Sequence, residues 1–304
     1  MSAGERSDEA GPVAVPAPGS RAAGPTVLRM VVGAHLRRLR EAAGISTEDA
    51  GYEIRASHSK ISRMELGRVG FKERDVADLL TVYGVTDPAR REALLELAED
   101  ANIPGWWQEY ADVVPAWFEP YLGLEQGAVV SRVYEVQDVP ELLQTTDYAR
   151  ALLAARHPEA PQEEIERRVA LRMRRHRVFD RPDPLKLWAV LDEAALRRVV
   201  GGAGTMRAQI RHLVEMARRP NVTVQVLPFA AGGHAAVSGP MTLLRFAEPE
   251  LPDVVYVEQL TGALYPDRQS DLIRYRDVLN RLGVQAAPPD RTPAILQNVL
   301  DQLA

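Results

Sequence analysis

The chain has 304 residues, which is enough for two domains, and its 46% hydrophobic and 26% charged residues are typical of an ordinary globular protein. It has no cysteine, which excludes disulfides, thiolate zinc sites and cysteine nucleophiles and fits a reducing cytoplasm. No apolar run reaches the roughly 18 residues that a membrane span needs. The net charge of −5 is not that of a general nucleic-acid binder.

The charge is unevenly distributed along the chain. Between residues 28 and 71, eight basic side chains stand against five acidic ones, which leaves an excess of three positive charges. Residues 1–26 before this region are rich in Ala, Gly, Pro and Ser, and we predict a disordered tail there, because so few large apolar residues cannot offset chain entropy.

Leu36 to Arg68 shows three short helical patterns separated by two turns. Ser46 and Ser57 are expected N-caps of the second and third helices, since a serine hydroxyl accepts a free backbone N–H. Ile61 and Met64 lie three residues apart and would face inward on the third helix. Two helices with a tight turn and a polar, basic second helix suit the major groove of DNA, which is about 12 Å wide.

This stretch resembles the XRE family of Cro- and phage-repressor-type helix-turn-helix proteins. The residues that carry the resemblance are Leu39-Arg40, Gly44, Ser46-Thr47, Ile54, Ser57, Ile61-Ser62-Arg63-Met64-Glu65 and Gly67. The resemblance implies a five-helix DNA-binding domain over residues 27–100. It also implies these DNA-facing residues: Thr47, Ser57, His58, Ser59, Lys60, Arg63 and Arg68.

The same resemblance implies an internal ion pair between Arg40 and Glu65. Two positions depart from the family pattern. Arg55 stands where a glycine is usual, and a residue with a Cβ resists a left-handed turn. Gly51 stands where alanine is usual, at a cost of about 1 kcal/mol in a helix interior. We expect a softer or slightly altered turn.

Residues 101–120 hold three of the four tryptophans and three prolines. We predict an aromatic, proline-rich linker whose aromatic side chains dock one domain on the other. The alternative is a ligand or partner surface that includes Trp106 and Trp107, because tryptophan and tyrosine are frequent in binding hot spots.

Residues 121–304 alternate strand-like and helix-like segments, which predicts a mixed α/β domain. LKLWAVL, NVTVQVLPF, MTLLRF and DVVYVEQL are the expected strands. A basic cluster, Arg172, Arg174, Arg175, His176 and Arg177, closes a long amphipathic helix expected over residues 163–181. These side chains could contact a phosphate; the alternatives are a solvated face or pairing with nearby acidic side chains.

Four polar side chains lie close to the ends of expected strands: Asp192, Glu193, His234 and Glu258. They could converge in a crevice at the strand ends as an effector, acid–base or metal site. The alternatives are a helix cap for Asp192 and a loop hydrogen bond for His234. The chain has no nucleophile elbow, HExxH or P-loop motif, so we expect no enzyme activity, no metal site and no cofactor.

The second half resembles a WhiJ-like group of actinobacterial XRE regulators. The segments that carry this resemblance are VPELLQTTDYARALL, LDEAALRRVVGG, NVTVQVLPFAAGGH and VVYVEQLTGALY. Glu141 departs from the glycine usual there. The resemblance implies a transcriptional regulator, and we expect a cytoplasmic, nucleoid-associated homodimer that binds operator DNA and takes a small partner protein or ligand. The alternatives are an antitoxin-like protein that mainly sequesters a small neighbour-encoded partner, and a DNA-tethered enzyme or sensor.

Overall fold

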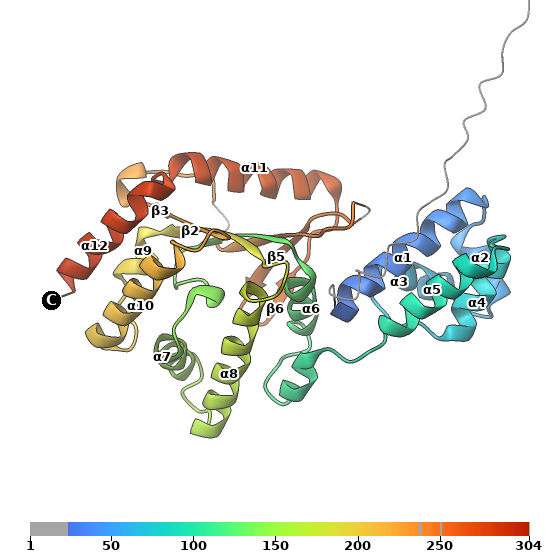
Figure 1. Ribbon diagram of the computed structural model, residues 1–304, viewed down its shortest axis with the longest axis horizontal. Coiled ribbons are helices and arrows are strands. Elements are labelled where there is room, and N and C mark those ends of the chain that lie inside the picture. Colours follow the sequence, from blue (N-terminus) through green and yellow to red (C-terminus); the bar gives the residue numbers. More distant parts are fainter. Residues whose placement is uncertain (1–23, 237–238, 250, 304) are drawn as a thin grey trace, which may run out of the picture. The chain divides into compact units, whose positions relative to one another are not determined.

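The computed structural model describes residues 24–236, 239–249 and 251–303 (Figure 1). The chain forms two compact units, Met1–Ile103 and Pro104–Ala304. The predicted disordered tail lies outside the described residues up to residue 23. Residues 24–26 belong instead to the first helix, since Pro25 suits a first helical turn and is buried.

The N-terminal unit is a bundle of helices, which confirms the predicted helix-turn-helix fold class. Its helices are α1 Gly24–Ala42, α2 Thr47–Glu53, α3 His58–Glu65, α4 Glu73–Val82 and α5 Pro88–Asp100. Ser46 caps α2 by accepting the backbone N–H of Asp49 at 3.0 Å. Ser57 caps α3 by accepting the backbone N–H of Lys60 at 3.2 Å. Each serine satisfies a donor that the first helical turn leaves without a partner.

Helices α1 and α3 approach each other closely at Gly33. A Cβ on this glycine would lie 2.5 Å from the carbonyl oxygens of Met64 and Glu65, so no larger residue fits. Large apolar side chains that are at most 1% exposed fill the rest of the interior; they include Leu36, Ile61, Met64, Leu79 and Leu80. This packing fixes one side of α3 and leaves its opposite side to solvent.

The C-terminal unit contains a six-stranded mixed sheet, which confirms the predicted α/β class. The strands are β1 Val130–Glu135, β2 Lys186–Asp192, β3 Val222–Leu227, β4 Met241–Arg245, β5 Val254–Gln259 and β6 Gly262–Leu264. Their order in the sheet is β3-β2-β1-β4-β5-β6. Strands β1, β2 and β3 pair in parallel, and the pairs β1–β4, β4–β5 and β5–β6 are antiparallel.

Helices connect and cover these strands. The α-helices are α6 Glu119–Gly127, α7 Thr146–Arg156, α8 Gln162–Arg175, α9 Glu193–Arg197, α10 Gly202–Met216, α11 Gln269–Gln285 and α12 Thr292–Gln302. Short 3₁₀ segments are η2 Trp106–Tyr110, η3 Glu141–Leu143, η4 His176–Phe179, η5 Phe229–Ala231 and η6 Pro289–Arg291. The helix predicted over residues 163–181 is therefore divided at Arg175 into α8 and η4. No helix within the described ranges is long and apolar enough to cross a membrane.

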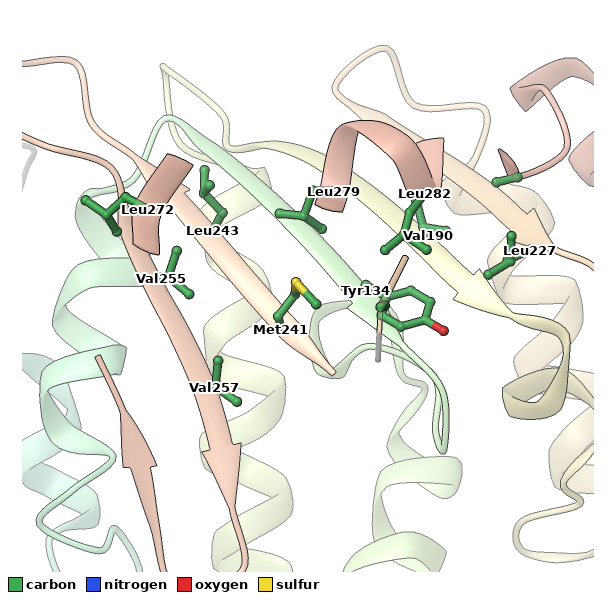
Figure 2. Packing of buried hydrophobic residues seen from close by; sticks show 12 residues of the cluster. Tyr134, Val190, Leu227, Met241, Leu243, Val255, Val257, Leu272, Leu279 and Leu282 are labelled. Carbon is green, nitrogen blue, oxygen red and sulfur yellow. The ribbon is translucent and has the colours of Figure 1, made fainter. Parts of the chain in front are cut away.

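The sheet gives the C-terminal unit two sides. On one side α11 covers a hydrophobic cluster, and Figure 2 shows its side chains, which include Tyr134, Val190, Leu243, Val255, Leu279 and Leu282. Helices α7, α8 and α10 lie on the other side (Figure 1). Because side chains alternate along a strand, Glu135 points to the side opposite Tyr134.

The aromatic segment before α6 is part of the C-terminal unit. Trp107 is 3% exposed and packs with Val114, Leu122 and Leu171. The ring of Trp106 meets that of Trp107 edge-on, with centroids 6.0 Å apart. We predicted a linker over residues 101–120, but from Pro104 onward these residues add to the core beside α8, because their tryptophans have apolar partners there.

Candidate functional site

The turn between α2 and α3 has a left-handed residue and a glycine that makes room for it. Arg55 has a φ of 54°, and it is the one non-glycine residue with positive φ in the described part of the chain. A Cβ on Gly51 would lie 2.8 Å from the carbonyl oxygen of Ala56 and 3.3 Å from the backbone nitrogen of His58. The two departures expected to soften this turn therefore act together: Arg55 takes the strained conformation, and Gly51 allows the chain to fold back closely.

We expect Gly51→Ala to lower the stability of the N-terminal unit by about 1 kcal/mol. Alanine gains roughly 1 kcal/mol of helix propensity over glycine, but pressing its methyl group against the Ala56 carbonyl costs about 1–3 kcal/mol. Thermal unfolding followed by circular dichroism measures the net change. The control is Gly204→Ala in α10, where an added Cβ meets open space and only the propensity gain applies. A Gly51→Ala variant as stable as the parent would contradict the close approach.

Polar side chains are exposed at the beginning of α3. Ser57, His58, Ser59 and Arg63 are all exposed. The Nε of Arg63 donates to the carbonyl oxygen of Ser59 at 3.4 Å, which orients the guanidinium toward this end of the helix. The beginning of α3 thus presents donors and acceptors to solvent, as a helix that enters the major groove does.

Three further predicted DNA contacts surround this helix end. Thr47 is half-buried at the start of α2, and its hydroxyl donates to the carboxylate of Glu48 at 3.1 Å. Arg68 is exposed after the end of α3. The ammonium group of Lys60, also predicted to face DNA, pairs with the carboxylate of Asp75 in α4.

Arg40 and Glu65 lie in contact between α1 and α3. The Nε of Arg40 donates to Glu65 Oε1 at 2.6 Å and its Nη2 to Oε2 at 3.0 Å. The Nη1 of Arg40 also donates to the carbonyl oxygen of Ile45 at 2.8 Å. The two side chains are 11% and 7% exposed, so this bidentate pair holds the end of α3 against α1 from a mostly desolvated position.

The C-terminal unit contains a cavity of about 810 Å³ on the side of the sheet opposite α11. Side chains from β1, β5, α6, α7 and α8 line it together with the segments around them. Carboxylates and guanidinium groups make up much of the lining: Glu125, Glu135, Asp138, Glu141, Glu258, Arg156, Arg168, Arg172 and Arg175. The volume of the cavity lies within the range of small-molecule sites.

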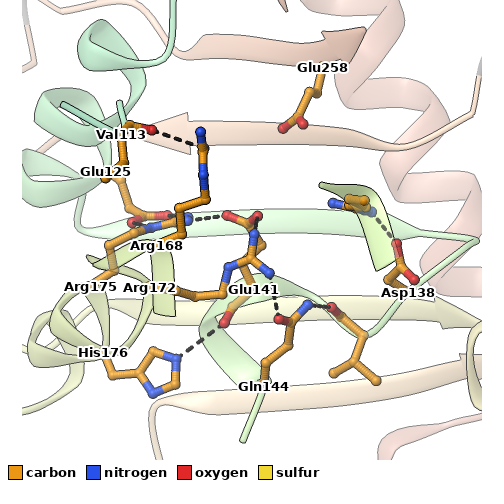
Figure 3. A network of polar contacts seen from close by, with 12 residues as sticks. Val113, Glu125, Asp138, Glu141, Gln144, Arg168, Arg172, Arg175, His176 and Glu258 are labelled. Atoms are coloured by element: carbon orange, nitrogen blue, oxygen red, sulfur yellow. Dashed lines mark hydrogen bonds and ion pairs between the residues drawn. The ribbon is translucent and has the colours of Figure 1, made fainter. Parts of the chain in front are cut away.

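A buried network of charged groups forms one wall of the cavity (Figure 3). Arg175 donates from Nε and Nη2 to the two carboxylate oxygens of Glu125, each at 2.8 Å. Arg172 and Arg175 both pair with the carboxylate of Glu141, and Arg172 donates to Gln144 Oε1 at 2.9 Å. Burial alone would raise the pKa of Glu141, but the two guanidinium groups outweigh it and lower that pKa to about 2.

Two carboxyl groups of the cavity differ from the rest. Among the described residues, Glu135 has no hydrogen-bond or ion-pair partner, and Glu258 accepts only the hydroxyl of Tyr256, at 2.9 Å. Burial, together with the nearby carboxylates of Glu141 and Asp138, raises the pKa of Glu135 to about 8. Glu258 is exposed to solvent at the cavity, and in Figure 3 no contact joins it to the network.

Comparison with known families assigns both units. Residues 31–94 match a helix-turn-helix domain, and residues 118–298, more than half of the 304, match a domain of unknown function, DUF5753. The chain belongs to the DUF5753 family. Its N-terminal unit contains a helix-turn-helix DNA-binding domain, which supports a role as a DNA-binding regulator. No curated protein and no solved structure matched the chain.

Of the four polar residues expected in one crevice, Asp192 and His234 lie close together, with His234 Nε2 4.0 Å from Asp192 Oδ2, but Glu258 lies apart from them. Tyr134 pairs with Val190 and Met241 across the sheet, so Asp192, two residues beyond Val190, points to the α11 side. Glu258 lies two residues beyond Tyr256, on the opposite side. The expectation that all four converge was wrong for Glu258, because it ignored the alternation of side chains along each strand.

Asp192, Glu193 and His234 make structural contacts in the DUF5753 domain. Asp192 caps α9 by accepting the backbone N–H of Ala194 at 2.9 Å. The Tyr134 hydroxyl lies 3.4 Å from both Asp192 Oδ2 and His234 Nε2. Glu193 pairs with Arg197 at 2.7 Å and accepts the backbone N–H of Phe229 at 2.9 Å.

Three arginines of the basic cluster at the end of α8, Arg172, Arg174 and Arg175, pair with acidic side chains of the same unit. Arg174 pairs with Glu109 and lies over the ring of Trp106, with its Cζ 4.9 Å from the ring centroid. Arg172 and Arg175 belong to the buried network described above. Trp107 is buried beneath Trp106, so the expected aromatic partner surface at these two positions is reduced to Trp106.

The cavity residues Glu135, Tyr121 and Tyr256 were not predicted from the sequence. Glu141 was noticed there only as a departure from glycine in a turn, whereas its carboxylate joins two arginines of α8. A signal was present: Glu135 follows Val133 and Tyr134 directly at the end of β1, and a carboxylate is costly to bury, so its burial there indicates a site.

Proposed function

We propose that this protein is a sequence-specific transcriptional regulator in which the DUF5753 domain binds an effector in its cavity and thereby changes the affinity of the helix-turn-helix domain for its operator. The observation that supports this proposal is the joining of an exposed, polar recognition helix to a second unit with an 810 Å³ charged cavity. Among the residues that the structure describes, two carboxyl groups of the cavity, Glu135 and Glu258, have no basic partner. Groups left unpaired at a cavity are available to a ligand.

The proposal includes a homodimer and binding without catalysis. One recognition helix makes few base contacts, so two half-sites about 34–36 Å apart are the natural route to useful operator affinity. Asp192 caps α9, and Glu193 pairs with Arg197 and accepts a backbone N–H, contacts that support a structural role for both residues. The proposal has a second class of effector, a small protein encoded by a neighbouring gene. This alternative follows from the resemblance to the WhiJ-like group.

Binding to random double-stranded DNA followed by sequencing tests the DNA-reading part. We expect enrichment of an inverted repeat whose half-sites are one helical turn, about 10 base pairs, apart or a multiple of it. Sedimentation velocity on the full chain, with and without that DNA, measures whether the protein is a dimer. A pool without any enriched motif would contradict sequence-specific reading.

Gel shifts on the enriched site test the effector part in two separate arms. One arm adds a protein-free small-molecule extract of the source cells, and the other adds the purified product of the neighbouring gene. A changed operator affinity in the first arm supports a ligand in the cavity. A change in operator affinity in the second arm alone would indicate that the effector is a partner protein and not a small ligand. No change in either arm would contradict an effector role for the DUF5753 domain.

A further inference from the structure

The charges that line the cavity do not balance one another. Every arginine of the lining already has a carboxylate: Arg156 pairs with Asp138, Arg168 with Glu164, Arg172 with Glu141, and Arg175 with Glu125 and Glu141. Among the described residues, Glu135 and Glu258 are the two carboxyl groups of the lining without such a partner. Within the described part of the chain, the cavity therefore has two carboxyl groups without a cation and no guanidinium without a carboxylate.

The two carboxyl groups face the same space. Thr242 of β4 pairs with Val133 of β1 and with Tyr256 of β5. Extended by two residues beyond these pairs, the same register would place Glu135 and Glu258 on either side of Pro240, which precedes β4. They therefore point to the same side of the sheet from strands that are two spacings, or about 10 Å, apart. Two glutamate side chains at this separation can approach one small group from opposite sides.

An aromatic wall lies beside these carboxyl groups. Tyr121 and Tyr256 have ring centroids 4.2 Å apart, and Phe118 stacks on Tyr121 at 5.4 Å. All three rings line the cavity with Trp117. Aromatic faces attract cations through their quadrupole and also bury flat apolar groups. The hydroxyl of Tyr256 donates to Glu258, which joins the wall to one of the unpaired carboxyl groups.

We propose that the cavity binds a small organic cation, a primary ammonium group attached to an aromatic body, with the ammonium between Glu135 and Glu258 and the ring against Tyr121, Tyr256 and Phe118. This inference deepens the proposed function, on which its regulatory meaning rests. The ammonium group supplies three donors to carboxylate oxygens that otherwise have few partners. An anionic ligand would instead have to displace Glu141 or Glu125 from an arginine.

Three probes with the same ring separate charge from shape: tyramine, its alcohol analogue 4-hydroxyphenethyl alcohol, and 4-hydroxyphenylacetate. We expect isothermal titration calorimetry on the full chain to show tyramine binding about tenfold or more tighter than the alcohol, because a hydrogen bond to a charged group contributes about 1.5–3 kcal/mol. The acetate should bind most weakly. Equal or tighter binding of the alcohol or the acetate, or no binding of tyramine, overturns the proposal.

The matched variants are Glu135→Gln and Glu258→Gln, alone and together, with Glu109→Gln as the control. Glu109 pairs with Arg174 at the surface and does not line the cavity. The double variant is expected to lose the preference for tyramine, to within about twofold of the alcohol, while Glu109→Gln keeps it. Neither cavity carboxyl group is ion-paired, so both variants should melt as the parent does. A preference that survives in the double variant overturns the assignment.

The pH dependence gives a second readout. Glu135 is faced by Glu141, Asp138 and Glu258 and by the guanidinium of Arg156. With its pKa at about 8, most of the Glu135 carboxyl is neutral at pH 7, and tyramine favours the ionised form. Binding should therefore release protons and tighten from about pH 6.5 to about pH 9, where a primary amine is still largely protonated. Glu135→Gln should flatten that trend, and a trend of opposite sign contradicts the proposal.

Operator gel shifts with tyramine keep the two proposals distinct. Tyramine that binds the parent chain but leaves operator affinity unchanged contradicts regulation through the cavity and leaves the cation site standing. An operator response to the small-molecule extract without any tyramine binding contradicts the cation site and leaves the regulator standing.

Discussion

Replacing Arg175 with methionine is expected to destabilise the C-terminal unit by about 3–5 kcal/mol. The guanidinium bonds both oxygens of Glu125 and also pairs with Glu141, and the side chains of Arg175 and Glu125 are only 4% and 2% exposed. Methionine keeps most of the volume but leaves the Glu125 carboxylate buried without its cation. The cost is the desolvation of that stranded charge, which greatly exceeds the net contribution of the intact pair.

Thermal and denaturant unfolding of the full chain measure this loss, and Arg174→Met on the same helix is the control. Arg174 pairs with Glu109, which is 67% exposed, so its loss should cost less than about 1 kcal/mol. The double variant Glu125→Leu/Arg175→Met should recover much of the stability, because an apolar pair replaces the charges. If Arg175→Met melts like Arg174→Met, the network is not buried as described.

The second large effect concerns DNA. Arg63→Ala is expected to weaken binding to the operator by about 1–3 kcal/mol, with little change on unrelated DNA, if the guanidinium reads a base edge. Competition gel shifts with specific and random duplexes measure both values. Arg37→Ala is the control, since it removes an exposed arginine of α1 that is paired with Glu41 at 2.8 Å.

The result on random DNA decides the role of Arg63. An equal loss on both duplexes would make Arg63 a phosphate contact. No loss on either duplex would take Arg63 out of the interface and contradict the assignment of α3 as the reading helix.

The helix-turn-helix unit was predictable because its signals are local. Ser46 and Ser57 stand directly before the helices that they cap, and Ile61 and Met64 show the buried side of α3 within one turn. The strands β2 and β3 were likewise visible as short apolar or β-branched runs. In each case the residues that determine the structure are neighbours in the chain.

The cavity was not predictable, because its residues meet through long-range contacts. Glu125 and Arg175 are 50 residues apart, and Glu141 reaches two arginines more than 30 residues away. The shared side of Glu135 and Glu258 depends on the order and register of β1, β4 and β5, which no single segment contains. The same missing register explains why Asp192 and Glu258 were expected together and lie on opposite sides of the sheet.

The pairing of Lys60 with Asp75 bears on how this protein responds to ionic strength. A lysine already neutralised by a carboxylate displaces little of the cation atmosphere of a duplex, and each phosphate that is neutralised contributes about 0.9 to the slope of log affinity against log salt. Arginines, rather than Lys60, would therefore set that slope. Operator affinity should then fall less steeply with added salt than the eight basic side chains between residues 28 and 71 suggest.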